Sequence, residues 1–121
     1  MNNYIVMSLM IILCPLCSLA EARVKTVGQG ATLNFSAEGI PEIYRSSFET
    51  MQRKCIKCHS MERTVVAINS GRAPVTGQQF NKQAVKAYGI KMMRKPNSDM
   101  NKQEIRDVVA LLNFFIDEKV K

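Results

Sequence analysis

The chain has 121 residues, of which 46% are apolar, and 17 basic residues against 10 acidic ones give it a formal charge of +7. This length supports one domain and excludes a large multidomain protein. The positive charge is compatible with nucleic acid, anionic membranes or acidic proteins as partners.

The first 22 residues are typical of an export signal. An apolar stretch reaches about Leu19, and an A-x-A cleavage pattern follows at 20–22. We therefore expect residues 1–22 to be a signal peptide and the mature protein to be periplasmic or otherwise exported. A retained membrane anchor is the alternative, but the stretch is short for a bilayer span and contains Pro15, which favours cleavage.

Cleavage would change both the cysteine content and the charge. Cys14 and Cys17 would be removed, so that only Cys55 and Cys58 remain. Loss of Glu21, with no lysine or arginine, would raise the formal charge by one, to about +8. Export argues against nucleic acid as a partner. We expect an acidic docking surface on a partner protein, and membrane association only if the N-terminal segment is retained.

Residues 23–45 contain several glycines and a proline and show no sustained hydrophobic period. This composition predicts an extended N-terminal arm, followed by a folded domain over residues 46–121. The domain begins with a predicted helix from Ser46 to about Cys58, because Ser46 and Glu49 match a capping box. We expect its basic residues, Lys54 among them, to point outward.

This helix leads into Cys55-Ile56-Lys57-Cys58-His59, which is the attachment pattern of c-type heme. Each thiol can add to one vinyl group of the porphyrin, and two intervening residues bring both sulfurs to the same heme edge. His59 then lies under the ring and can bind the iron as proximal ligand. The motif predicts one covalently bound heme c, attached through Cys55 and Cys58.

Two other uses of this cysteine pair deserve comparison with heme attachment. A structural zinc site usually has four ligands, and the mature chain offers only two cysteines and one histidine. A thioredoxin-like oxidoreductase would need a βαβ pattern, and none is visible. The sequence therefore favours heme.

Downstream of the motif, the sequence predicts some secondary-structure elements better than others. Residues 64–68 are compatible with a strand or a helix, and residues 69–74 have loop composition. A helix is predicted from a cap at Thr76 to about Met93 or Arg94. Its apolar face comprises Phe80, Ala84, Val85, Tyr88 and Met92, and Pro96 ends it.

The last helix has the clearest boundaries. Asn101 is its expected N-cap and Glu104 completes a capping box, while Met100 and Ile105 are placed as a hydrophobic staple. Its expected apolar stripe comprises Ile105, Val108, Val109, Leu112, Phe115 and Ile116. The residues after this stripe are expected to form a solvated tail.

The second iron ligand decides the chemistry of a bound heme. The chain has a single histidine, which excludes bis-histidine ligation within a monomer. A methionine sulfur would close the site and favour electron transfer, whereas an open site would allow ligand binding or peroxide chemistry. Met92 is the first choice because it continues the helix face of Val85 and Tyr88. Met93 is the second choice, and Met100 remains an alternative.

The chain resembles the small monoheme class I c-type cytochromes of bacteria. The likeness covers residues 46–118 and is carried by the helix before the heme motif, by Met92-Met93-Arg94-Lys95-Pro96, and by the C-terminal helix with Phe114 and Phe115. It implies an all-α, cytochrome c-like fold in which the first and last helices cross at the heme edge, with one of these phenylalanines at the crossing. It also selects Met92 over Met93 as the distal ligand.

The resemblance implies a periplasmic electron carrier rather than an enzyme, without a small-molecule substrate, that exchanges electrons with redox partner proteins. A heme-based sensor or peroxidase-like module with an open distal site is an alternative, as is a heme subunit of a larger oxidoreductase complex. Because the chain has no tryptophan, Arg63, Arg72 and Tyr88 are the candidates to bind the heme propionates.

Overall fold

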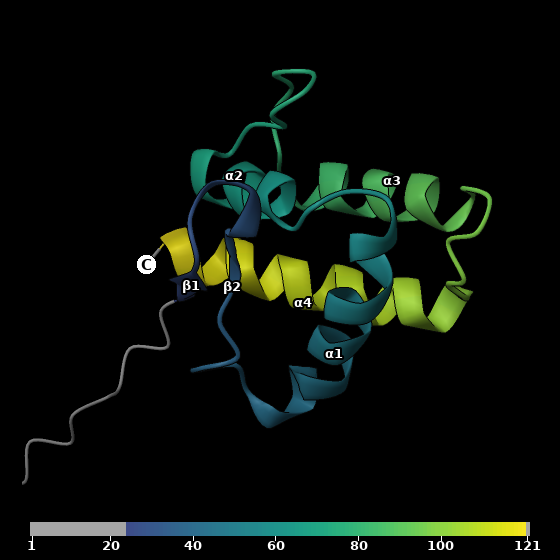
Figure 1. Cartoon of the computed structure of the whole chain (residues 1–121), viewed down its shortest axis with the longest axis horizontal. Coiled ribbons are helices and arrows are strands. Elements are labelled where there is room, and N and C mark those ends of the chain that lie inside the picture. Colours follow the sequence, from purple (N-terminus) through teal and green to yellow (C-terminus); the bar gives the residue numbers. More distant parts are fainter. Residues whose placement is uncertain (1–23, 121) are drawn as a thin grey trace, which may run out of the picture.

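The computed structural model describes residues 24–120, and the expected signal peptide with Cys14 and Cys17 lies outside them. The described part contains four α-helices and one small sheet and is 60% helical. The helices are α1 (Arg45–Lys54), α2 (Glu62–Ser70), α3 (Lys82–Met93) and α4 (Lys102–Val120), and the antiparallel strands are β1 (Thr26–Val27) and β2 (Asn34–Phe35) (Figure 1). It is therefore mostly helical, as expected, apart from the small sheet.

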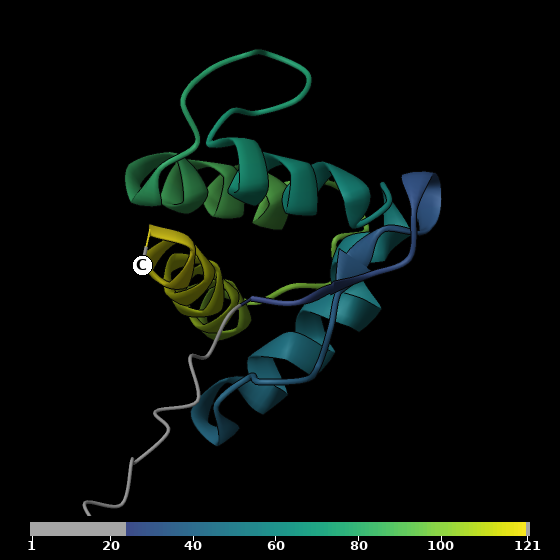
Figure 2. The same cartoon turned by 90° about the vertical axis from the view of Figure 1, so that its left-hand side faces the viewer.

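Helix α4 is the central element of the fold. Helix α1 crosses it on one side, and α2 and α3 lie together along another side, an arrangement that two perpendicular views share (Figures 1 and 2). The core forms where these layers meet. Its fully buried large side chains are Met51, Val65, Ile68, Val85, Leu111 and Phe115.

The apolar stripe of α4 differs from the expected one at a single turn. Leu111 is 0% exposed, whereas Leu112 is only half-buried and Val109 faces α3. The reason is that α4 packs against neighbours on two sides, so that its buried surface is wider than one stripe.

Residues 24–44 belong to the packed domain and are not a separate extended arm. The two strands pair through Thr26 with Phe35 and Val27 with Asn34. Phe35 is 2% exposed, and its ring stacks on that of Phe115 in α4 at a centroid distance of 4.5 Å. The sequence-based boundary at residue 46 is therefore wrong for the core, since the contact partner of Phe35 lies near the other end of the chain.

Two of the three expected helix starts are wrong. Helix α1 begins at Arg45, directly after a 3-10 turn at Glu42–Tyr44, and its N-cap Tyr44 makes no side-chain capping bond. Ser46 therefore lies inside the helix. The expected cap at Thr76 is displaced to Asn81, whose Oδ1 accepts a hydrogen bond from the backbone N–H of Ala84 at 3.0 Å.

The late start of α3 follows from a closed loop before it. The N–H of Phe80 donates to the carbonyl of Gly71 at 2.8 Å, and that of Ala73 donates to Gln78 at 2.8 Å. These bonds fix residues 71–80 as a turn that projects from the layer of α2 and α3 (Figure 2). The preceding segment 64–68, which the sequence left open, is part of α2.

The expected capping box of α4 is confirmed. Asn101 Oδ1 accepts from the N–H of Gln103 and of Glu104, each at 2.9 Å, and a Glu104 carboxylate oxygen accepts from the N–H of Asn101 at 3.0 Å. At the other end the tail is not fully solvated. Lys119 Nζ donates to the carbonyls of Ile68, at 2.8 Å, and Asn69, where α2 ends.

Gly89 marks the closest approach of α3 to α4. A Cβ at this position would lie 2.8 Å from Val109 Cγ2 and 3.4 Å from Ile105 Cγ2. A valine has little rotamer freedom on a helix, so the two helices would have to separate. This close approach explains why a glycine occupies the position inside the helix.

We expect Gly89→Ala to lower the free energy of unfolding, because overpacking costs about 1–3 kcal/mol while the gain in helix propensity is about 1 kcal/mol. In a Val109→Ala background the same change is expected to raise it, because the blocking methyl group is gone. Denaturant unfolding of the four proteins tests this reversal of sign. Equal effects of Gly89→Ala in both backgrounds would contradict the packing explanation.

Candidate functional site

The Cys-x-x-Cys-His motif lies at the end of α1, where the α-helix tightens into a 3-10 turn at Cys55–Lys57. Cys55 is half-buried and packs against the core, whereas Cys58 is exposed, and the two thiols are not joined by a disulfide. Both cysteines and His59 line one cleft. The structure thus brings the three predicted attachment and proximal residues to a common surface.

The orientation of His59 leaves one ring nitrogen available. Its Nδ1 lies 2.9 Å from the carbonyl oxygen of Ser60. A carbonyl oxygen only accepts hydrogen bonds, so Nδ1 carries the proton and donates. In the neutral ring Nε2 then has a free lone pair, which is the arrangement of a histidine that binds a metal.

The surroundings of Cys55 raise the pKa of its thiol. Burial is the main cause, and the neighbouring Cys58 raises the pKa further. A nucleophilic or redox-active cysteine of a thiol oxidoreductase instead needs a lowered pKa.

Between residues 24 and 120 no cluster of three His, Cys, Asp or Glu side chains is placed to hold a metal ion.

The cleft spans about 1070 Å³, its open mouth included, and is enclosed by α1, the motif, α2, the 71–81 loop, α3 and the segment before α4. Most of its lining is apolar. The apolar lining residues outside the motif are Met51, Met61, Ala67, Ala73, Pro74, Val75, Phe80, Gly89, Met92 and Met100. A cleft with this apolar lining suits a flat apolar cofactor.

The candidate methionines differ in whether they line this cleft. Met92 lines it from α3, and Met93 does not. Successive helix residues point about 100° apart, so only one of the pair can face the cleft. Met100, the third candidate, also lines it, and so does Met61, which is 3% exposed and belongs to the core.

The segment between Met93 and Met100 is a tight turn. The N–H of Lys95 donates to the carbonyl of Met92 at 3.1 Å, and Ser98 Oγ donates to that of Met93 at 3.0 Å. Asn97 and Asp99 have left-handed backbone angles, with φ of 63° and 52°. Asparagine and aspartate tolerate this region better than other residues, so the sequence suits a turn that returns the chain to the cleft.

Lys54 holds this turn and the start of α4 against α1, and the expectation that it points outward is wrong. Its side chain is 15% exposed, and its Nζ donates to the two carboxylate oxygens of Glu104 at 2.8 and 3.0 Å and to the carbonyl of Asp99. Lys57 adds an ion pair with Asp99 at 3.2 Å. We call these four side chains the lysine clamp, and Lys54 also lines the cleft.

The clamp lowers the pKa of both carboxyl groups. For Glu104 the cause is the hydrogen bond from Lys54 and then the backbone N–H of Asn101, and for Asp99 it is the hydrogen bond from Lys57 and then the charge of Lys54. A lowered pKa in the folded state means that the clamp stabilises the fold above the ordinary glutamate and aspartate range. This stabilisation is lost as the pH falls through the folded pKa values.

We therefore expect Lys54→Met, which keeps most of the apolar stem, to lower the free energy of unfolding at neutral pH. The difference from wild type is expected to shrink as the pH falls through the lowered pKa of Glu104, below which this carboxyl group is protonated in both proteins. Denaturant unfolding at neutral pH and at a pH below that lowered pKa measures the difference. Lys82→Met is the control, because the exposed Lys82–Asp117 pair should contribute less than about 1 kcal/mol.

Of the three candidates for binding heme propionates, two line the cleft and one does not. Arg63 and Tyr88 line the cleft, whereas the Arg72 guanidinium donates to the carbonyl of Gly77 in the loop at 3.1 Å and does not line it. The sequence analysis did not identify Lys54 or Ala73-Pro74-Val75 as lining residues of the cleft. For Ala73-Pro74-Val75 a signal was available, because these three apolar residues stand together in an otherwise polar loop.

None of the helices within residues 24–120 is both long and apolar enough to cross a bilayer. No protein-family model, no curated protein and no solved structure matches the chain significantly. The function is therefore inferred from the Cys-x-x-Cys-His motif and from the residues that share its cleft.

Proposed function

We propose that this chain is a c-type cytochrome, exported to the periplasm, that carries one covalently bound heme c and transfers electrons between redox proteins. The observation that carries the proposal is the convergence on one apolar cleft of the Cys55-x-x-Cys58-His59 motif and of Met92 from α3. The residues fit such a cofactor: two unpaired thiols, one imidazole with a free nitrogen, and thioether sulfurs in an apolar lining. When bound, the heme supplies an iron that alternates between its ferrous and ferric states.

Each protein group has a distinct part in this proposal. Cys55 and Cys58 would tether the cofactor, and His59, with Nδ1 held by the carbonyl of Ser60, would bind the iron through Nε2. Met92 would supply the distal sulfur. A neutral thioether favours the reduced iron and closes the site to exogenous ligands, which suits an electron carrier.

The helix arrangement supports the cytochrome c-like form of the proposal. Helices α1 and α4 pack across each other (Figure 1), and the two expected phenylalanines of α4 contact different parts of the chain. Phe115 is buried in the core, and the Phe114 ring stacks on Tyr44, at the start of α1, with centroids 5.0 Å apart. The apolar walls would keep water away from the iron, which lowers the reorganisation that accompanies each change of charge.

The experiment is expression of the full chain with an export route and a heme-attachment system. We expect an intact mass increased by one heme, thiols that resist alkylation, and a chromophore that stays with the protein in acidified acetone. The Cys55→Ser, Cys58→Ser double variant is the control and should release any heme it binds. A bare peptide mass with both thiols of the wild-type protein open to alkylation would refute the proposal.

A further inference from the structure

The positive charge of the chain is concentrated in one continuous segment. Residues 63–98 contain no aspartate or glutamate and seven basic residues, a number equal to the whole formal excess of +7. The other 10 basic residues are balanced by the 10 acidic ones. The excess is therefore a property of one part of the sequence and not of the surface in general.

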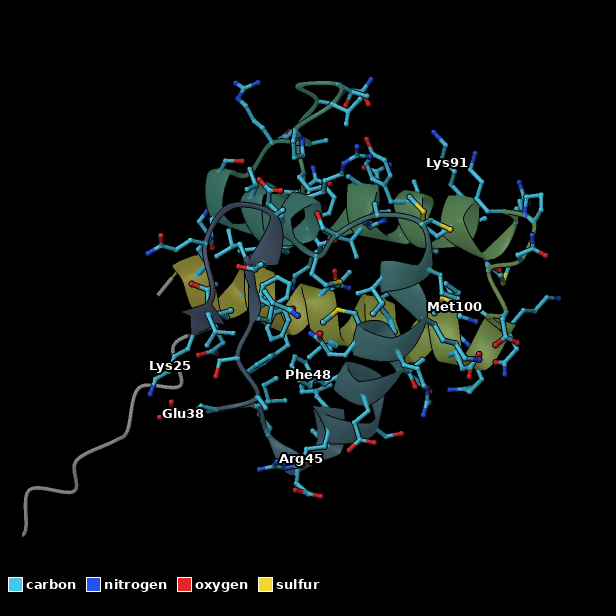
Figure 3. All side chains as sticks on the ribbon, viewed as in Figure 1. Lys25, Glu38, Arg45, Phe48, Lys91 and Met100 are labelled. Atoms are coloured by element: carbon cyan, nitrogen blue, oxygen red, sulfur yellow. The ribbon has the colours of Figure 1, made fainter. Side chains whose placement is uncertain are left out.

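This segment forms most of α2, the following loop and α3, which are the layer on one side of α4 (Figures 1 and 2). Lys91 lies on the upper side of the molecule in Figure 3, while Lys25, Glu38 and Arg45 lie on the lower side. The net positive charge is thus unevenly distributed over the structure as well as along the sequence.

The cations of α3 are largely uncompensated. In the described part of the chain, Lys82 is the one basic residue of this helix with a carboxylate partner, Asp117 at 2.7 Å. Lys86 and Lys91 are exposed, and neither has a carboxylate partner among the described residues. The lower side differs, because Lys25 pairs with Glu38 and Arg45 pairs with Glu42 at 2.6 Å.

One of these two cations, Lys91, lines a shallow groove at the end of α3. Its apolar floor comes from Ala87, Ile90 and Pro96, and its cations are Lys91, Arg94 and Lys95. We call it the α3 groove. Lys95 lines both this groove and the cleft with the heme motif. A molecule seated in the groove would therefore lie directly beside the wall that carries Met92.

We propose that the α3 groove is the docking surface for an acidic segment of a partner protein, which exchanges electrons with the neighbouring site. The proposal rests on the proposed function and adds the surface and the chemistry of the partner. Carboxylates of the partner would meet the three cations, and its apolar atoms would meet the floor. An anionic membrane is less suited, because the large exposed apolar residues, Val27, Ile43, Ile56 and Val75, all lie outside the groove.

The test compares two charge-reversed proteins of equal net charge, as full chains. One is Lys91→Glu, Arg94→Glu, Lys95→Glu in the groove. The other changes Lys25 and Arg45 on the lower side and the exposed Arg53 of α1 to glutamate. The probes are poly-L-glutamate and vesicles of phosphatidylcholine with phosphatidylglycerol, both at low ionic strength. Circular dichroism verifies folding, and the corresponding glutamine variants replace any reversal that does not fold.

We expect the groove variant to bind poly-L-glutamate about tenfold more weakly than the control variant, because it loses local contacts as well as net charge. Equal weakening in the two variants would overturn the proposal, since binding would then follow net charge alone. A groove dependence seen only with the vesicles would also overturn it and indicate a membrane surface. The assay needs no heme, so its outcome is independent of whether the proposed function holds.

Discussion

In the heme-loaded protein, Met92→Ala is expected to abolish the weak charge-transfer band that a methionine–iron bond gives in the ferric state and to lower the reduction potential. The reason is the loss of a soft, neutral ligand that favours ferrous iron. Ferrous Met92→Ala is also expected to bind carbon monoxide without denaturation, because its distal position is open. Absorption spectra and potentiometric titration of the purified variants measure these effects.

Met93→Ala is the matched control, because Met93 is the adjacent residue on α3 and does not line the cleft. It is expected to keep both the band and the potential. Met100→Ala tests the other methionine of the cleft. Loss of the band in Met100→Ala and its retention in Met92→Ala would assign the distal ligand to the turn before α4. A wild-type protein that lacks the band and binds carbon monoxide would instead favour a sensor or peroxidase-like module.

Phe115→Ala is expected to lower the free energy of unfolding by about 3–5 kcal/mol, the usual range for a large aromatic side chain in a core. Phe115 is 1% exposed and joins α4 to β2 by stacking on Phe35. Phe114→Ala is the control at the adjacent position. Phe114 is half-buried, and its truncation should lower the free energy of unfolding by about 1–2 kcal/mol, since it buries less apolar area than Phe115 does.

A double-mutant cycle separates the Phe35–Phe115 contact from the cavity that each truncation leaves. We expect a coupling of about 0.5–1.5 kcal/mol between the two rings. Denaturant unfolding of the wild type, the two single alanine variants and the double alanine variant provides the four free energies. Additive effects would mean that the two rings have no direct energetic interaction, contrary to their stacking at a centroid distance of 4.5 Å.

The sequence was informative where a signal lies within a few residues. The Asn101–Glu104 capping box is confirmed because its donors and acceptors are three residues apart and need no other part of the chain. The same holds for the end of α3 at Met93, which Pro96 enforces. For the site, helical periodicity named Met92 before Met93, and Met92 alone of the two lines the cleft.

The sequence failed where distant segments decide the outcome. The cap at Thr76 has a suitable local pattern, but hydrogen bonds from Phe80 back to Gly71 close the loop and delay the helix. The partner of Lys54 is 50 residues away at Glu104, so no local pattern could reveal the clamp. The packing of Phe35 likewise depends on the last helix, which composition within residues 23–45 cannot show.

The unequal distribution of charge over the two sides of α4 gives the domain a permanent electric dipole moment. Such a dipole exerts a torque on the protein in the field of a negatively charged molecule. The domain would therefore rotate during diffusion and present α3 before any contact forms. Added salt should weaken this pre-orientation, so that productive encounters become rarer although the contact surface is unchanged.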